Sequence, residues 1–98
     1  MDISIKKDLA SNWFKLLQNA ICDDILKIEK NKVNFQSTSW NRSSKKDEGG
    51  GEYRILKNGK IFEKVGVNFS KVYGKFPKQF QKNIPGASKD PRFWASGI

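Results

Sequence analysis

The stretch from Gly49 to Gly74 limits the possible folds of this chain more than any other part of it. It begins with three consecutive glycines, contains an Asn-Gly pair and ends in a run of alternating apolar and small residues. Asn-Gly is the preferred dipeptide for a two-residue β-hairpin turn, because both turn residues need a positive φ. The stretch therefore predicts a hairpin with strands at 53–57 and 60–63 and a two-residue turn at Asn58 and Gly59.

The second strand of this hairpin is predicted to continue to Ser70. Val65, Val67 and Phe69 should share one face of that strand, because successive side chains of a strand point to opposite sides. The opposite face then carries only short side chains, those of Gly66, Asn68 and Ser70. Such a face meets water, lines a cavity or lets another element approach closely.

Residues 43–51 are polar and rich in glycine, which predicts a loop. The triple glycine at its end could cradle an anion with backbone amides, because glycine permits positive φ and close approach. The spacing of a phosphate-binding P-loop is absent, and Asp47 and Glu48 adjoin the glycines. We therefore favour a connecting loop and keep a ligand-binding loop as the alternative.

Residues 5–29 are predicted to form one amphipathic helix. Apolar residues recur there at spacings of three and four, on one face that must pack against another element: Leu9, Trp13, Leu16, Leu17, Ala20, Ile21, Ile25 and Ile28. Cys22 and Leu26 fall beside this stripe. Cys22 is interpreted as a half-buried structural residue, because the neighbouring aspartates disfavour a reactive thiolate.

The rest of the chain completes one small α+β domain, predicted to span residues 1–98. Alternation predicts a strand at 31–41, and the whole segment 31–74 should contain strands and the hairpin. Residues 75–92 hold all three prolines and should form an extended connection, after which 93–98 begins another strand. The sequence thus predicts an N-terminal helix followed by an antiparallel β meander. Its small core should depend on aromatic residues: Trp13, Phe14, Phe35, Trp40, Phe62 and Phe69.

Charge and residue usage limit the possible partners and compartments. The formal net charge is +9, and residues 31–98 carry all of the excess, with 14 Lys and Arg against 5 Asp and Glu. That asymmetry is explained equally well by an anionic partner and by a solvated, lysine-rich surface without such a partner. The single cysteine and the absence of a long apolar run favour a cytoplasmic chain without a membrane span or a signal peptide. The chain contains no histidine.

Several segments in order resemble the N-terminal third of the oxygen-dependent coproporphyrinogen III oxidase family. They are SW at 39–40 with Arg42, GGG at 49–51, NG at 58–59, IFEKVGVNFSKVYG at 61–74 and FWASGI at 93–98. The nine residues FEKVGVNFS are specific enough to make chance a poor explanation. The resemblance extends along nearly the whole chain, although 43–48 is more lysine-rich than is usual in the family and 75–92 matches poorly.

The resemblance implies an oxidoreductase of heme and porphyrin biosynthesis. The family converts two propionates of coproporphyrinogen III oxidatively into the vinyl groups of protoporphyrinogen IX. Dioxygen is the oxidant, no organic cofactor is used, and a divalent metal is reported for some bacterial members. Family members are homodimers built on a flat antiparallel sheet covered by helices. The implied partners of this chain are therefore coproporphyrinogen III and a second copy.

The resemblance also implies where functional residues lie. The early dimer-interface strand of the family matches Ile61, Phe62, Glu63, Lys64, Val65, Gly66, Val67, Asn68, Phe69 and Ser70. Substrate propionates are expected near Arg42, Gly49, Gly50, Gly51 and Arg54, because Arg suits bidentate carboxylate contacts and glycine amides suit oxyanions. The substrate-contacting serine and the histidine-rich segment of the family would follow Ile98. No catalytic residue and no metal ligand is therefore expected here, and the chain is expected to be a truncated member, inactive alone.

Two other classes of function remain open from the sequence. The net charge and the aromatic residues would suit a small basic nucleic-acid-binding module, with phosphate contacts and base stacking. Against this class, no recognised nucleic-acid-binding signature occurs and Lys outnumbers Arg. The other class is a non-catalytic remnant that associates through unpaired strand edges.

Overall fold

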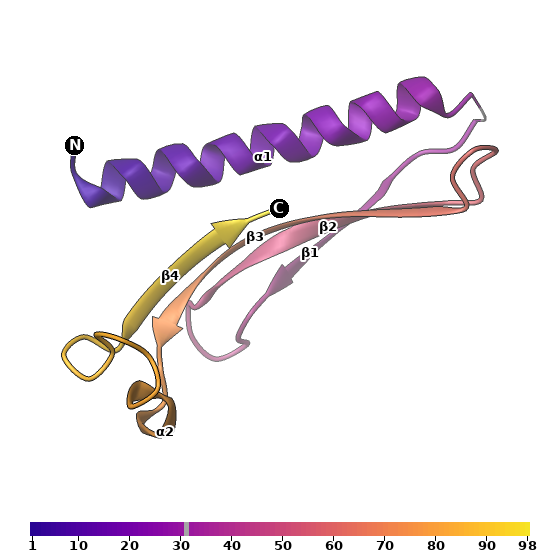
Figure 1. Cartoon of the computed structure of the whole chain (residues 1–98). Helices are drawn as coiled ribbons and strands as arrows, with labels where there is room; N and C mark the ends of the chain where they lie inside the picture. Colours follow the sequence, from indigo (N-terminus) through magenta and orange to yellow (C-terminus); the bar gives the residue numbers. More distant parts are fainter. Residues whose placement is uncertain (31) are drawn as a thin grey trace.

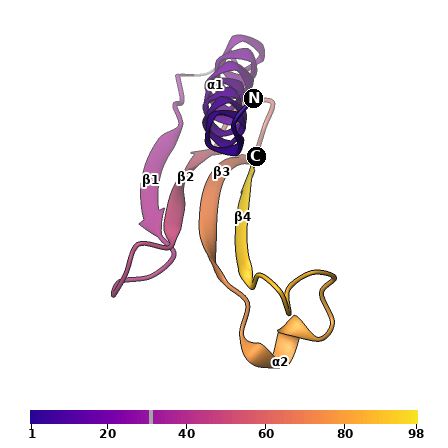
Figure 2. The same cartoon turned by 90° about the vertical axis from the view of Figure 1, so that its left-hand side faces the viewer.

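One long helix crosses one face of a four-stranded antiparallel sheet (Figures 1 and 2). The structure is a computed structural model that describes residues 1–30 and 32–98. Its elements, in order, are α1 (Ile3–Ile28), β1 (Gln36–Asn41), β2 (Gly49–Lys57), β3 (Lys64–Lys75), α2 (Lys78–Gln81) and β4 (Arg92–Gly97). The strands lie in the order β1-β2-β3-β4, each antiparallel to its neighbour. The predicted α+β class, a helix followed by an antiparallel meander, is confirmed.

The helix covers only one face of the sheet, as the end-on view in Figure 2 shows. Pairing of Arg54 with Val67 and of Glu52 with Phe69 places these residues on the covered face. The predicted alternation in β3 is correct, because Val67 and Phe69 are buried whereas Gly66 and Asn68 are exposed on the other face. The core is correspondingly thin, and its buried apolar residues are Cys22, Leu56, Val67, Phe69 and Ala87.

The predicted apolar stripe is not the face by which α1 docks. Trp13 is 60% exposed and Leu16 is 61% exposed, and Leu9 is exposed beside them. The buried positions of the helix are instead Ser11, Gln18 and Cys22. Gln18 is completely buried, and its Nε2 donates to the backbone oxygens of Glu52 and Val67 at 2.9 and 3.1 Å. These hydrogen bonds to the sheet therefore fix the rotation of the helix about its axis, and much of the apolar stripe remains exposed to solvent.

The connection between β2 and β3 differs from the predicted two-residue turn. Lys57 pairs with Lys64, so residues 58–63 form a six-residue loop, and the predicted strand at 60–63 is absent. Asn58 has the positive φ expected of it, 60°. The loop is wider because it wraps around the carboxylate of Glu29, which follows α1. That carboxylate accepts three backbone N–H groups, from Lys60, Ile61 and Phe62, at 2.7, 2.9 and 3.0 Å.

The strand predicted at 31–41 is shorter in the structure. Asn31 lies outside the described residues, and 32–35 are irregular, so β1 begins at Gln36. Gln36 pairs with Ile55, near the end of β2. In that register Phe35 and Asn34 would lie opposite Leu56 and Lys57, the last residues of β2, but the pairing ends at Gln36.

Two further boundaries differ from the sequence interpretation. The glycines at 49–51, predicted to lie in a loop, form the start of β2, and only the segment between Asn41 and Gly49 connects the strands. The connection predicted at 75–92 is confined to 76–91, because Lys75 ends β3 and Arg92 begins β4, and it includes the single-turn helix α2. No helix in the described part of the chain is long and apolar enough to cross a membrane.

We predict that Glu29→Gln destabilises the fold by about 1–3 kcal/mol, because an amide cannot accept three N–H groups as a carboxylate does. Urea unfolding followed by circular dichroism measures the change. Glu63→Gln, at an exposed side chain of the same loop, is the matched control and should leave the midpoint unchanged. Equal midpoints for Glu29→Gln and the wild type would contradict the role of Glu29.

Candidate functional site

The glycine strand borders a hollow on the helix-covered face of the sheet. This hollow, called here the glycine pocket, has a volume of about 390 Å³ and is bounded by Gly49–Gly51, Lys15, Asp47, Glu52, Lys71 and Tyr73. Lys15 comes from α1, and its Nζ lies 6.0 Å from the centre of the Phe69 ring. Two lysines and two carboxylates thus surround the pocket. Its floor is formed by the three glycines, which carry no side chains.

The glycines are required by the close approach of neighbouring strands. A Cβ on Gly50 would meet the backbone oxygen of Trp40, and one on Gly51 would meet that of Phe69, both well inside the 3.0 Å that real Cβ atoms keep. β2 is a central strand, and central strands use their amide groups in ladders on both sides. The Gly49 N–H donates to Asp47 Oδ1 at 3.2 Å. The glycine amides are therefore engaged within the chain, and any ligand would meet the glycines from the open face.

Arg42 lies on the sheet face away from α1. Its Nη1 forms an ion pair with Glu48 at 2.9 Å and donates to the Tyr73 backbone oxygen at 3.2 Å. The guanidinium carbon lies 5.0 Å from the centre of the Phe93 ring. Arg42 is therefore not part of the glycine pocket, and its guanidinium already has a carboxylate partner.

Arg54 lies on the covered face, two residues along β2 from Glu52. Its Nε is 2.6 Å from Glu52 Oε2, and this hydrogen bond lowers the pKa of Glu52 below its usual value. Burial raises the pKa of the neighbouring Cys22 thiol, although a hydrogen bond with Arg54 opposes that shift. Cys22 is therefore a protonated, buried residue at neutral pH. The structure does not gather Arg42, Arg54 and the glycines into one site.

Sequence reasoning missed the side chains that line the glycine pocket. The Tyr73 hydroxyl donates a short hydrogen bond to Asp47, which lowers the pKa of Asp47 and raises that of Tyr73. Lys71 and Tyr73 continue the alternation of Val67 and Phe69 and therefore lie on the same face. That alternation was the available signal. Residues 1–30 and 32–98 contain no group of three or more His, Cys, Asp or Glu side chains placed to hold a metal ion.

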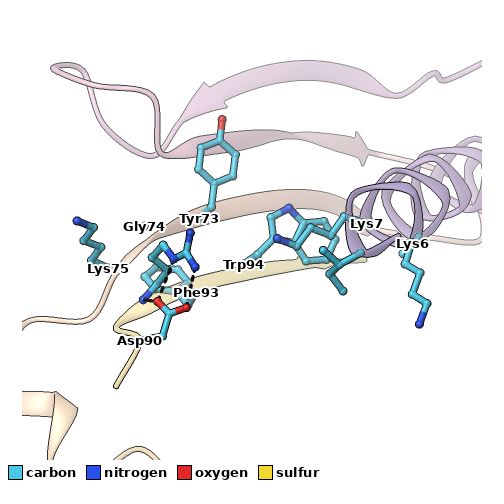
Figure 3. A pocket seen from close by; sticks show the side chains of 11 residues that line it. Lys6, Lys7, Tyr73, Gly74, Lys75, Asp90, Phe93 and Trp94 are labelled. Carbon is cyan, nitrogen blue, oxygen red and sulfur yellow. Dashed lines mark hydrogen bonds and ion pairs between the residues drawn. The ribbon is translucent and has the colours of Figure 1, made fainter. Parts of the chain in front are cut away.

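A larger hollow lies between the first turns of α1 and the paired ends of β3 and β4 (Figure 3). This α1–β4 pocket has a volume of about 960 Å³, and its lining includes Lys6, Lys7, Lys75, Arg92 and Trp94. None of its cationic residues was singled out from the sequence. They come from three separate elements, and no local motif links them.

The chain matches the protein-family model described as coproporphyrinogen III oxidase over residues 10–98. Proteins named oxygen-dependent coproporphyrinogen-III oxidase are similar to it at 42% identity in Rickettsia felis, 41% in Rickettsia akari and 40% in Rickettsia bellii. Each match covers 94% of this chain and 34% of the relative. The chain therefore spans about a third of the length of the curated relatives it matches. No solved structure matches it significantly.

We predict that Gly50→Ala or Gly51→Ala destabilises the fold by about 1–3 kcal/mol, because the added methyl group forces β2 away from β1 at Gly50 and away from β3 at Gly51. Gly66→Ala on β3 is the matched control, since a Cβ there meets nothing within 4 Å. Thermal unfolding of the three variants measures the difference. If Gly50→Ala and Gly51→Ala melted with the control, close strand approach would not be the reason for the glycines.

Proposed function

Because the chain belongs to the coproporphyrinogen III oxidase family, we propose that it contributes to the oxidative decarboxylation of coproporphyrinogen III to protoporphyrinogen IX. The observation that carries this proposal is the family match over residues 10–98. The chain itself would hold no organic cofactor, and dioxygen would accept the electrons. We also propose a cytoplasmic location, consistent with one free, buried cysteine.

The reaction defines what a contributing segment could do. Each converted propionate releases its carboxyl group as CO₂, loses one hydrogen from the carbon next to the ring and passes two electrons to dioxygen. The propionates that do not react stay ionised and must be held in place. Lysines suit that task as cationic donors, and Lys15 and Lys71 flank the open floor of the glycine pocket. The proposed role of this chain is therefore to hold propionates, with the bond-breaking residues supplied by parts of the family fold that it does not match.

The shape of the chain supports a role within a larger fold. Its radius of gyration is 17.2 Å, whereas about 13 Å is expected for a compact domain of 100 residues. One sheet face has no helical cover among the described residues, and the outer side of α1 exposes large apolar residues such as Trp13. The uncovered sheet face and the outer side of α1 are therefore available to pack against other parts of a larger fold.

A chimeric oxidase tests the proposed function. In it, this chain replaces the matched third of the Rickettsia felis enzyme, and protoporphyrin fluorescence is measured with coproporphyrinogen III and oxygen. We expect product from the chimera, because the chain supplies an equivalent segment. We expect none from the 98-residue chain alone or from the relative with the segment deleted. A chimera that melts cooperatively but makes no product would contradict the proposal.

We propose further that the segment 61–70 lies at a homodimer contact. Residues 61–63 belong to the loop held by Glu29, and the remainder forms the first half of β3. Gly66 and Asn68 are exposed on the sheet face away from α1. β4 pairs only with Ser70–Lys75, so the preceding stretch of β3 has no strand beside it, on the side away from β2, in the described residues. A second copy could therefore approach this short-side-chain surface closely.

Gly66→Lys in the chimera should shift it from dimer to monomer in sedimentation equilibrium, because a long charged side chain would stand in the contact. Its melting as a folded monomer should be retained, since space is open around Gly66. Thr38→Lys, an exposed position on the same sheet face in β1, is the control. A Gly66→Lys chimera that sediments as the dimer, like the control, would place the contact elsewhere.

A further inference from the structure

The loop of residues 58–63 lies at one end of the molecule. It joins β2 to β3 beyond the last paired residues of the two strands, beneath the end of α1 (Figure 1). Its backbone is fixed, because the N–H groups of Lys60, Ile61 and Phe62 bind the buried carboxylate of Glu29. Ordering a loop on binding costs free energy, and this loop is already ordered. Its side chains are therefore presented to a partner in a defined arrangement.

The 58–63 loop and the end of α1 expose apolar surface together. Ile61 is 57% exposed, and Phe62 beside it is only half-buried. Ile28, the last residue of α1, is 51% exposed. It precedes Glu29, whose carboxylate holds the loop, so Ile28 and Ile61 lie at the same end of the molecule. Single exposed apolar residues are common, but grouped ones with a polar rim mark protein or membrane contacts.

The rim of this apolar group is basic. Lys57 and Lys64 lie directly opposite each other in the ladder at the base of the loop, Lys60 lies within the loop, and Lys30 follows Glu29. All four lysines are exposed, and none has a carboxylate oxygen within 4.0 Å in the part of the chain that the structure describes. Like charges directly opposite each other in a ladder are destabilising. The Lys57–Lys64 pair therefore favours an anionic partner, which would relieve the repulsion.

The acidic residues near the loop do not balance these four lysines. The Glu29 carboxylate is buried and accepts three backbone N–H groups. The loop itself contains one acidic residue, Glu63, which is exposed. Asp23 and Asp24 lie about one turn before Lys27 on α1 and offset that lysine, which is not one of the four. An excess of positive charge therefore surrounds the loop.

The combination of charge and apolar surface distinguishes between the possible partners. A nucleic acid would bind the lysines, but it offers no apolar medium for Ile61. Base stacking requires accessible aromatic rings, and the one aromatic residue of the loop, Phe62, is half-buried. An anionic lipid surface satisfies both features, because its headgroups attract basic residues and its acyl chains receive apolar side chains.

We propose that the 58–63 loop docks the chain on an anionic lipid membrane surface. Ile61 enters the boundary between headgroups and acyl chains, and the four lysines bind the surrounding headgroups. One apolar side chain and a few lysines give reversible binding rather than permanent attachment. The cytoplasmic leaflet is the anionic one, which agrees with the cytoplasmic location proposed above. The sheet surface at Gly66 and Asn68 remains available for the proposed dimer contact.

The test is co-sedimentation of the 98-residue chain with vesicles of phosphatidylcholine that contain about 30% phosphatidylserine. Vesicles of phosphatidylcholine alone should bind at least about tenfold less. Ile61→Ser should weaken binding to the anionic vesicles by about tenfold, through the loss of apolar burial. Lys57→Gln/Lys64→Gln should weaken it by about tenfold or more, because each lysine near an anionic surface contributes about fivefold.

Each variant has a matched control away from the loop. Leu16→Ser removes an apolar side chain that is 61% exposed on α1. Lys45→Gln/Lys46→Gln removes the same charge from exposed lysines of the connection between β1 and β2. Both controls should leave vesicle binding within about twofold, because they lie outside the contact. Thermal unfolding should show that Ile61→Ser stays folded, since Ser retains the backbone N–H that binds Glu29.

Several results would overturn the proposal. They are no binding to either kind of vesicle, equal binding to both kinds, or equal losses in a variant and its control. Binding that is lost in the lysine variant but kept in Ile61→Ser would indicate a surface for a nucleic acid or an acidic protein, and it too would overturn the proposal. Because no turnover is measured and the loop lies outside the glycine pocket, failure here leaves the chimera experiment unaffected.

Discussion

The fold depends on how α1 is attached to the sheet, and that attachment is polar. Gln18 donates to backbone oxygens of β2 and β3, and at the other end Glu29 binds the amides of the 58–63 loop. The two residues lie about three helical turns apart on the same side of the helix. Together they fix both the rotation and the direction of α1, which apolar contact alone would leave loosely defined because the buried apolar core is so small.

This polar attachment explains what the sequence could and could not predict. The helix, the alternation of Val67 and Phe69 and the antiparallel meander follow from local periodicity, which needs no knowledge of the partner. The docking face of α1 does not follow from periodicity. A periodic pattern predicts that apolar residues are buried, whereas the structure buries Gln18 and leaves Trp13 60% exposed. The six-residue loop was missed for the same reason. Asn-Gly predicts a tight turn from local preference, whereas the loop is shaped by a carboxylate about 30 residues earlier.

The glycines at 49–51 show a different limit. Their composition suggested a flexible loop, yet they form a strand in which Cβ atoms would collide with neighbouring carbonyl oxygens. A glycine-rich composition indicates that the backbone needs conformational freedom or space. It does not distinguish a mobile loop from a strand that neighbouring backbones approach closely. The candidate site was incompletely predicted because its charged residues come from separate elements. Lys15 reaches the glycines from α1, and Asp47 reaches them from the preceding connection.

The same face of α1 delivers a lysine to each pocket. Lys7 and Lys15 are eight residues apart, or about 12 Å along the helix, and each places its ammonium group over an aromatic ring of the sheet, Trp94 or Phe69. In the glycine pocket, Glu52 beside Lys15 is already paired with Arg54, and Asp47 beside Lys71 accepts from the Tyr73 hydroxyl. In the α1–β4 pocket, Asp90 balances only Arg92. Each pocket therefore combines a lysine of α1 with a carboxylate that another residue of the chain already binds.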